Sequence, residues 1–504
     1  MSAGVGSGAS HGRGPGGGLS AGPSGGLDAC PGGALIHVAA VDLGATSGRV
    51  MRAIVGEGRL EMVEAARFPN GPVERADGLH WDIEALREHI MTGLRTALTD
   101  DPLITSIGID SWAIDYGLIV GGVLQGEPFH YRDERSARGV DAVHALVPKP
   151  ELFAATGLQH LPFTTVFQLA AEKPERLRAA EQLLLIPDLV AYWLTGRAIA
   201  ESTNASTTAL LDSISRTWHE ELIGRLGLPR ALFAELIEPG QVVGPLTRVM
   251  AESLGAPEGL VVTAVGSHDT ASAVVAVPMS RPDAAYISCG TWGLVGLELE
   301  HPVMTDQARE ANFTNEAGVD GRTRFLHNVM GLWLLSESVR GWQAESGSRI
   351  DLGALLAEAA AVTEPVPVFD VNDPRLLPLG DMPARIAAVL AEQGLAVPPS
   401  RAGLARCIVD SLATAFAEAV LTAARLADRP VSVIHLVGGG SLNHLLCQLT
   451  ADRAGMPVLA GPVEATALGN VLVQARAQGL GGTLEQLRAL VAATHPPQRF
   501  EPRT

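Results

Sequence analysis

An α/β fold with two domains is predicted by three features of this 504-residue sequence. The chain is too long for one ordinary core and has a natural length for two large domains. Short apolar runs typical of buried strands alternate with helical patterns in both halves. A strand, a glycine turn and a second strand open each half, which indicates an internal duplication with a boundary near residue 276.

Composition excludes several classes of protein. Hydrophobic residues make up 47% of the chain and charged residues 18%, which is compatible with a sizeable core and excludes global disorder. The formal net charge of −18 argues against a nucleic-acid partner, because binding phosphate backbones needs clustered Lys and Arg. A bound nucleotide would therefore be held locally, by backbone amides, a metal ion and a few arginines.

Lysine usage excludes two common nucleotide-binding folds. The only lysines are Lys149 and Lys173, and neither follows a glycine-rich loop. A P-loop needs G-x-x-x-x-G-K-[ST], and a protein kinase needs a lysine on a strand. The sequence therefore predicts neither fold.

Cysteine spacing and the N-terminal segment predict a cytoplasmic protein. The four cysteines are far apart and form no CxxC, which is typical of a reduced protein without a disulfide framework. No membrane span is predicted from apolar runs. Residues 1–34 are mostly Gly, Ser, Ala and Pro without an apolar core segment, so we expect a disordered tail and not a signal peptide.

The first predicted hairpin consists of a strand at 35–41, a turn and a strand at 49–55. Its turn, Gly44–Arg49, can wrap a phosphate through backbone N–H groups while Arg49 adds charge; an ordinary hairpin turn is the alternative. A second hairpin, with Gly290–Gly293 as its turn, occupies the matching place in the other half. Two facing phosphate-binding hairpins are how an actin-like fold holds a nucleotide between its domains, so the pair favours the functional interpretation.

A third glycine-rich turn, Gly438–Gly440, follows an apolar strand at 433–437 and precedes a helix predicted over 443–454. Three glycines permit close approach of a ligand to the backbone. The pattern is not a dinucleotide fingerprint, because Asn443 stands where Gly or Ala is needed. This turn is either a simple connection or, given the two hairpins, a loop that contacts adenosine. The segment 365–383, within the second half, is rich in Pro and Asp, which predicts a long surface loop.

The segment Gly266–Thr270 precedes an apolar, helix-like run at 271–277. Ser267 or Asp269 can serve simply as a helix N-cap. Alternatively, Asp269 accepts the proton of a sugar hydroxyl that attacks a γ-phosphate. A helix N-terminus would lower its pKa and make it a weak base, which phosphoryl transfer tolerates because it depends mainly on positioning and charge stabilisation.

Asp42, at the end of the first strand, is a candidate for organising Mg²⁺ through water. Mg²⁺ binds one or two carboxylates together with substrate phosphates and keeps its remaining waters. The alternative is that Asp42 caps the turn by accepting hydrogen bonds from nearby amides.

Nine segments resemble, in their order, the FGGY family of carbohydrate kinases. The resemblance covers residues 36–480, and the segments are VDLGATSGRVM, IGIDSWAIDYGL, YRDERS, ESTNASTTALLD, SHDTASAV, ISCGTWGLVG, FLHNVMGLWLL, HLVGGGSLNHLLCQLTAD and AGPVEATALGN. Within the family, SHDTAS, ESTNASTT and GPVEATALGN together are similar to the members that phosphorylate L-rhamnulose.

The resemblance implies two actin-like (ribonuclease H-like) domains with an ATP and sugar cleft between them. A sugar- and phosphate-binding domain would span 35–275, a nucleotide-binding domain 276–485, and a C-terminal extension 486–504. The implied reaction converts ATP and L-rhamnulose to ADP and L-rhamnulose 1-phosphate, with Mg²⁺, in L-rhamnose catabolism. The implied partners are the small sugar and ATP, without nucleic acid or membrane, in a monomer or small homo-oligomer.

The resemblance also implies roles for individual residues at matching positions. Asp269 would be the proton acceptor. The residues implied to bind the sugar are Ala113, His268, Asp269, Thr270 and Asn328. Those implied to bind ATP are Ala45, Thr46, Ser47, Gly48, Arg49, Thr291, Ser336 and Gly439. Trp112 and Asp115 are further candidates for the sugar pocket.

Two positions depart from the family pattern. Ala113 stands where relatives often have Gly, and its methyl group would crowd a backbone that contacts the sugar. Ser336 stands where relatives have Gln near the ATP, which shortens a side-chain contact. A kinase for another ketose, such as L-fuculose or L-xylulose, therefore remains an alternative, as does a non-catalytic sugar- or ATP-binding regulator. The carboxylate at Asp269 favours the enzyme.

Overall fold

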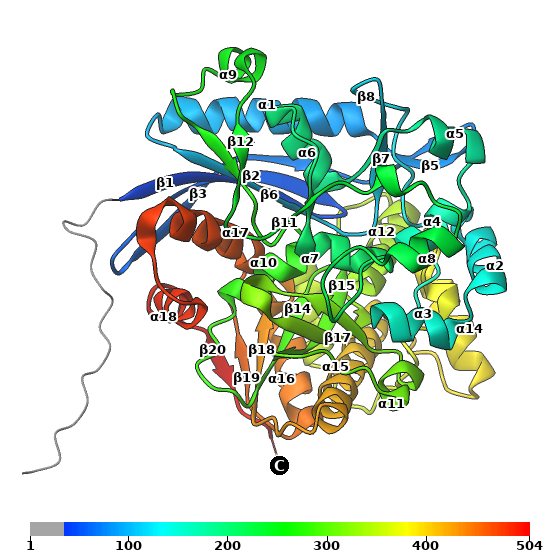
Figure 1. Cartoon of the computed structure of the whole chain (residues 1–504). Coiled ribbons are helices and arrows are strands. Elements are labelled where there is room, and N and C mark those ends of the chain that lie inside the picture. The colour runs from blue at the N-terminus through cyan, green and yellow to red at the C-terminus, as the bar shows by residue number, and fades with distance from the viewer. Residues whose placement is uncertain (1–34, 504) are drawn as a thin grey trace, which may run out of the picture.

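The computed structural model describes residues 35–503, and two mixed β-sheets form its centre (Figure 1). The first sheet has the order β12-β13-β6-β1-β2-β3 and the second β16-β17-β15-β14-β18-β19-β20. The strands of the first are β1 (Ile36–Leu43), β2 (Ser47–Gly56), β3 (Arg59–Pro69), β6 (Ser106–Ser111), β12 (Val242–Pro245) and β13 (Val261–Thr263). Those of the second are β14 (Ala284–Cys289), β15 (Trp292–Leu299), β16 (Thr314–Ala317), β17 (Thr323–Met330), β18 (Val433–Val437), β19 (Val458–Ala460) and β20 (Gln498–Phe500). The predicted α/β class is confirmed.

The helices of the first half are α1 (Ile83–Asp100), α2 (Ser136–Leu146), α3 (Lys149–Thr156), α4 (Thr165–Ala170), α5 (Pro174–Ala179), α6 (Ile186–Thr195), α7 (Ser202–Ala205), α8 (Glu220–Arg225), α9 (Arg248–Leu254) and α10 (Asp269–Ala276). Those of the second half are α11 (Asp306–Glu310), α12 (Trp333–Ser346), α13 (Leu352–Ala360), α14 (Met382–Glu392), α15 (Arg401–Leu426), α16 (His444–Ala454), α17 (Ala465–Ala475) and α18 (Leu484–Thr494). Small additional strands are β4 (Pro72–Arg75), β5 (Gly78–Trp81), β7 (Tyr116–Val120), β8 (Val123–Leu124), β9 (Gln182–Leu185), β10 (Ala200–Glu201) and β11 (Leu236–Ile237).

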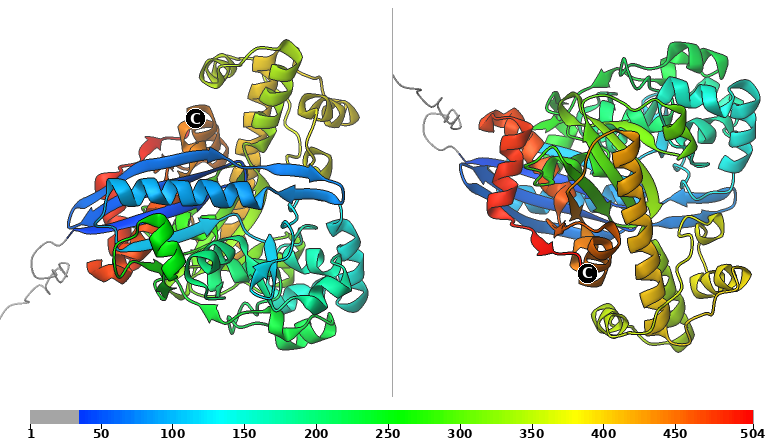
Figure 2. Two further views of the ribbon diagram at one scale, coloured as in Figure 1. Left: turned by 90° about the horizontal axis from the view of Figure 1, so that it is seen from above. Right: turned by 90° about the horizontal axis from the view of Figure 1, so that it is seen from below.

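The two sheets enclose a middle layer formed mainly by α10 and α17 (Figure 1). Alternate residues of β1 face opposite ways, as a strand's period of two requires. Val38 and Ala40 pack with the middle layer, whereas Ala39 and Val41 pack with the core on the other face. Viewed from above and below, α1 covers the outer face of the first sheet and α15 that of the second (Figure 2). Both sheets are therefore buried on two faces.

The helices α10 and α17 approach each other closely. A Cβ atom at Gly469 of α17 would collide with the backbone carbonyl of Ser272 of α10, so only glycine fits there. This close packing of a helix from each half sets the position of the first turn of α10. Asp269 is the first residue of that turn.

Both predicted hairpins are confirmed. Strands β1 and β2 pair antiparallel up to Leu43 and Gly48, and β14 and β15 pair up to Cys289 and Gly293. In each hairpin the glycine after the turn is covered by a phenylalanine ring from its own half, Phe68 in the first and Phe416 in the second. The two turns are thus built alike.

Two expectations need correction. Helix α15 contains an 18-residue window apolar enough to cross a membrane, although the sequence predicted none. Because 67% of that window is buried against the rest of the protein, as in a core helix, it is no sign of a span. The segment 365–383 is a loop over most of its length, but Phe369, Val371 and Leu376 are buried. It is therefore anchored to the core and is not a plain surface loop.

Candidate active site

A cleft of about 500 Å³ lies between the two halves. Its walls come from the β1–β2 turn and the start of α10 in the first half, and from the β14–β15 turn, β16, β17 and the Gly438–Gly439 loop in the second. The predicted residues that line it are Asp42, Ala45, Thr46, Ser47, Arg49, Trp112, Ala113, His268, Asp269, Thr270, Thr291, Asn328 and Gly439. Residues more than 300 positions apart in the chain therefore share one cavity.

Three predicted residues do not line this cleft. Gly48 packs under the ring of Phe68, which is a structural reason for glycine at this position. Ser336 is exposed on the first turn of α12. Asp115 is fully buried behind the cleft wall.

The first glycine turn is held rigid by hydrogen bonds. The Gly44 N–H donates to the Ser47 carbonyl at 2.9 Å, and the side chain of Asn70 donates to the Gly44 carbonyl at 2.8 Å. The Asn70 N–H also donates to the Thr46 carbonyl at 3.1 Å. Because the turn's carbonyls are engaged, its shape is set before any ligand arrives.

Asp42 and Arg49 form a partly buried pair at this end of the cleft. The Arg49 Nε and Nη2 atoms both donate to Asp42 Oδ2, at 2.9 and 2.6 Å. Arg49 also forms an ion pair with Glu464, which precedes α17. Burial lowers the pKa of Arg49, but these two carboxylates outweigh it and raise the pKa overall. The carboxylate of Asp42 thus binds Arg49 in preference to the turn amides, contrary to the capping alternative.

The glycines of the third turn divide into two kinds. Gly438 has a φ of +82°, and a Cβ there would lie 2.9 Å from the Cys289 carbonyl. A Cβ at Gly440 would collide with the Cys289 side chain. Gly439 has open space around its Cβ position and lines the cleft. Two glycines therefore let the loop pack on the β14–β15 turn, and the third leaves room in the cavity.

Asp269 lies at the floor of the cleft with its side chain 32% exposed. His268 is the N-cap residue of α10 and no side chain caps the helix, so the capping alternative for Ser267 or Asp269 is wrong. Burial raises the pKa of Asp269; His268 opposes this shift and the negative charge of Asp42 adds to it. The expected lowering by the helix N-terminus is therefore overturned, because desolvation dominates.

Glu201 organises the loop that carries His268 and Asp269. Its Oε2 atom accepts hydrogen bonds from the Ser267 N–H at 3.0 Å and the Ser267 hydroxyl at 2.7 Å. The Thr203 hydroxyl donates to the same oxygen at 2.6 Å. Sequence reasoning missed Glu201 as a site residue, although it opens the ESTNASTT segment that carried the resemblance.

Asp115 plays a similar role at the other end of the cleft. Its Oδ2 accepts from the indole N–H groups of Trp81 and Trp112, at 2.7 and 3.1 Å, while Gln168 donates to Oδ1 at 2.8 Å. Next to Ala113, Ile114 has a φ of 69°, which is rare for a β-branched residue and costs about 1–3 kcal/mol. The Asp115 network holds this strained segment against the cavity.

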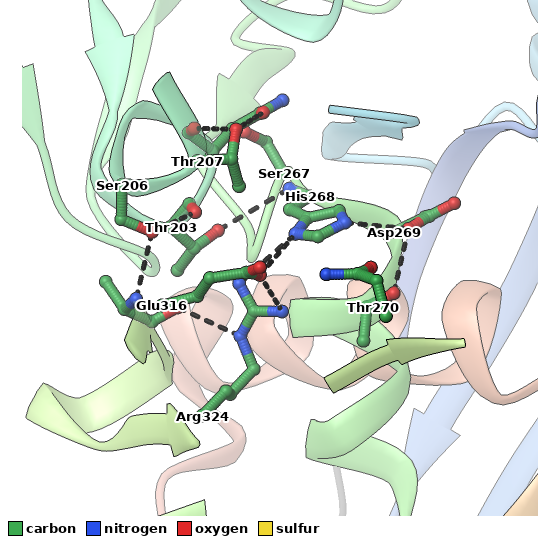
Figure 3. Close-up of polar contacts among 12 residues, drawn as sticks. Thr203, Ser206, Thr207, Ser267, His268, Asp269, Thr270, Glu316 and Arg324 are labelled. Atoms are coloured by element: carbon green, nitrogen blue, oxygen red, sulfur yellow. Dashed lines mark hydrogen bonds and ion pairs between the residues drawn. The ribbon is translucent and has the colours of Figure 1, made fainter. Parts of the chain in front are cut away.

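Two second-half strands complete this end of the cleft. On β17, the Asn328 amide donates to Gln159 Oε1 at 3.0 Å, so a residue of the first half orients it. On β16, Glu316 lies against His268 and forms a buried ion pair with Arg324 of β17 (Figure 3). The sequence held no local signal that these residues reach the cleft, because Asn328 is distant from Gln159 in the chain and His268 is distant from Glu316 and Arg324.

The carboxylates of the cleft do not form a preformed metal cage. Among residues 35–503, no group of three or more His, Cys, Asp or Glu side chains could hold a metal ion. Asp42 uses only Oδ2 for Arg49, which leaves Oδ1 for a cation. Asp110 is buried beside it on β6 and accepts from Asn470; burial and the charge of Asp42 raise the pKa of Asp110 well above its usual range, which favours a neutral acid. This donor set fits an ion that arrives with phosphate ligands and water.

Two models of the FGGY family of carbohydrate kinases match the chain. The model of the N-terminal domain covers residues 38–276, and that of the C-terminal domain covers residues 285–478. The matches together span most of the chain.

Several curated relatives are similar over nearly the full length. The rhamnulokinase of Pectobacterium carotovorum subsp. carotovorum (strain PC1) is 42% identical over 478 residues, covering 93% of this chain and 94% of the relative. That of Enterococcus faecalis (strain ATCC 700802 / V583) is 40% identical, with 92% and 93% covered. That of Bacillus subtilis (strain 168) is 37% identical, with 92% and 95% covered.

Solved structures show the same fold at low identity. A ligand-bound xylulose kinase from Lactobacillus acidophilus superposes with a TM-score of 0.76 at 16% identity, covering 93% of this chain and 94% of that one. The Plasmodium falciparum glycerol kinase with ADP superposes with a TM-score of 0.72 at 15% identity and the same coverage.

Proposed function

The chain belongs to the FGGY family of carbohydrate kinases, and from this premise we propose that it transfers the γ-phosphoryl group of ATP to L-rhamnulose. The products are ADP and L-rhamnulose 1-phosphate, in the catabolism of L-rhamnose. Full-length relatives named rhamnulokinase, at 37–42% identity, support this acceptor over other ketoses. As a soluble metabolic kinase, the enzyme would work in the cytoplasm.

The position of Asp269 is the observation that carries the proposal. It lies in the same cavity as the two glycine turns at Gly44–Ser47 and Gly290–Trp292, one from each half. In the proposed reaction these turns hold the triphosphate through backbone N–H groups. Asp269 takes the proton from the O1 hydroxyl of the sugar as that oxygen attacks the γ-phosphorus, and ADP leaves.

The raised pKa of Asp269 suits this role. A base is more effective when its pKa approaches the working pH, provided that it remains ionised there. Burial moves the pKa of Asp269 in that direction. Closure of the two halves around both substrates would also exclude water, which otherwise competes with the sugar for the γ-phosphoryl group.

We propose that Mg²⁺ accompanies ATP and is held by Asp42 through water. When bound, the ion would neutralise charge on the β- and γ-phosphates. The free Oδ1 of Asp42 in the cleft supports this assignment. Arg49, on the same strand pair, holds that carboxylate in place by donating two hydrogen bonds to its Oδ2.

The acceptor pocket is proposed to consist of Ala113, His268, Thr270 and Asn328, all of which line the cleft. Ala113 occupies a backbone segment held by Asp115, so its methyl group is a fixed part of the pocket wall. The sugar must therefore fit beside that methyl group.

A coupled assay of ADP release over a panel of ketoses tests the proposal. With the full chain, ATP and Mg²⁺, kcat/KM should be highest for L-rhamnulose and lower for L-fuculose, L-xylulose and D-xylulose. ADP release that is faster with another ketose would reassign the acceptor. Absence of sugar-dependent ADP release with every ketose would favour a binding protein of the same fold.

A further inference from the structure

A buried ion pair lies beside the cleft on the second sheet. Glu316 of β16 stands directly opposite Arg324 of β17, with 3.0 Å between Oε2 and Nη1. Arg324 is 0% exposed and Glu316 4%. Taking two charges out of water costs several kcal/mol per ion, approximately. Neither atom makes a well-aligned hydrogen bond within the pair, so the pair is poorly satisfied on its own.

The unsatisfied side of this pair faces His268 (Figure 3). His268 Nδ1 lies 3.2 Å from Arg324 Nη2 and 3.2 Å from Glu316 Oε2. The other ring nitrogen, Nε2, lies 3.3 Å from Asp269 Oδ1. The imidazole ring therefore bridges the ion pair and the proposed catalytic base.

The partners determine where the ring carries its hydrogen. Arginine can only donate, so Arg324 bonds to Nδ1 when Nδ1 is unprotonated, and the hydrogen is then on Nε2. If Nδ1 instead donates to Glu316, Nε2 must also carry a hydrogen, because a bare nitrogen would face the Asp269 carboxylate. With Asp269 ionised, as a base must be, both arrangements place a hydrogen on Nε2, the ring nitrogen that lies 3.3 Å from Asp269 Oδ1.

This hydrogen distinguishes the two oxygens of Asp269. Oδ1 lies 3.3 Å from His268 Nε2 and accepts a hydrogen bond from the Thr270 hydroxyl at 3.1 Å. Both of these contacts are made to Oδ1 and not to Oδ2. We propose that Glu316 and Arg324 are positioning residues that act through His268 to hold Asp269 by Oδ1, so that Oδ2 takes the proton of the sugar hydroxyl. This inference rests on the proposed function, since it assigns how the base of that reaction is oriented.

The second sheet offers a matched control for Glu316. Glu298 of β15 flanks Arg324 on the side opposite to Glu316, in the same cross-strand row. Its carboxylate pairs with Arg488 of α18 at 2.8 Å. Glu298→Gln therefore removes an equivalent carboxylate from an equivalent buried pair without touching His268.

The first experiment compares Glu316→Gln with Glu298→Gln in steady-state kinetics. Glu316→Gln should lower kcat by roughly tenfold to a hundredfold, within the range for a misplaced general base. Its KM for ATP should stay within about twofold of the wild type. Glu298→Gln should leave kcat within about twofold of the wild type. A normal kcat in folded Glu316→Gln would overturn the proposal, as would equal losses in both variants.

A double-mutant cycle separates positioning from general damage. In an Asp269→Asn background the base is already absent, so adding Glu316→Gln should lower the residual single-turnover rate by less than about twofold. A merely structural role would lower the rate by the same factor in both backgrounds, and that result would overturn the proposal.

A spectroscopic measurement covers the case in which Glu316→Gln does not fold. With ¹⁵N-labelled histidine in the wild-type chain, the His268 signals can be assigned by their loss in His268→Gln. Nitrogen shifts should show a protonated Nε2; a neutral ring protonated at Nδ1 would overturn the proposal. This readout is independent of turnover, so it stands even if no ketose is phosphorylated and the proposed function fails.

Discussion

The two ends of the cleft are built in different ways. At the phosphate end, short turns present backbone N–H groups, and small residues such as Gly439 leave open space. At the sugar end, buried side chains from distant segments fix one another, as Glu201 does for Ser267 and Asp115 for Trp112. The first end depends on local chain geometry and the second on networks that form only after folding.

This difference teaches where sensitivity to substitution should lie. A backbone cradle offers many equivalent donors, so the loss of one contact is partly compensated. A carboxylate that accepts several hydrogen bonds in a buried site has no substitute. Changes at the sugar end should therefore cost more than comparable changes at the phosphate end.

The largest effect is expected for Asp269→Asn. Loss of a general base typically costs ~10²–10⁴-fold in rate, so kcat should fall by about that factor. The dissociation constant for ATP, measured by calorimetry, should stay within about twofold, because the phosphate cradle is unchanged. Asp306→Asn, on an exposed helix turn outside the cleft, is the control and should be normal. Near-normal kcat in Asp269→Asn would remove the base from the mechanism.

Glu201→Gln should have the next largest effect. The Thr203 N–H donates to Oε1 of Glu201, and three Ser267 and Thr203 groups donate to Oε2, so the NH₂ of glutamine faces donors whichever way the amide lies. Buried polar groups left unsatisfied cost about 1–3 kcal/mol. The melting temperature should fall, and kcat should fall about tenfold or more as the loop bearing Asp269 shifts. Glu235→Gln, with an 81% exposed side chain, is the matched control. Unchanged melting and kcat would show that the loop is held by other contacts.

The same contrast explains what the sequence could predict. Both glycine hairpins, the Gly438–Gly440 loop and Asp269 were predictable, because each is a short motif with a direct physical meaning. Glu201 and Gln159 were not predictable, because the residues they contact, Ser267 and Asn328, are distant in the chain. The pair Glu316–Arg324 was not predictable, because it contacts His268 of the other half. The sequence predicted the wrong direction for the pKa shift of Asp269, a lowering where burial raises it, for a related reason. Local sequence shows a helix N-terminus, whereas only the assembled cleft shows the burial.

At the phosphate end, two adjacent glycines give a smaller and more selective effect. Gly439→Ala places a methyl group in open space at the cleft, so stability should be unchanged and KM for ATP should rise a few-fold. Gly438→Ala forces alanine to a positive φ against the Cys289 carbonyl, so it should lower the melting temperature. Thermal melts and ATP titrations of both variants separate the two roles. If Gly439→Ala leaves KM for ATP unchanged, adenosine does not contact this loop.

The smallest effect is expected at Ser336, which the family resemblance assigns to ATP but which lies exposed on α12, outside the cleft. Ser336→Ala should change kcat and KM for ATP by less than about twofold, because an exposed hydroxyl contributes little. Ser336→Gln, which restores the residue of relatives, adds a longer polar side chain at the same place. If Ser336→Gln lowers KM for ATP while Ser336→Ala is neutral, α12 approaches the nucleotide only when the halves close, and the phosphate end then depends on side chains as well as backbone.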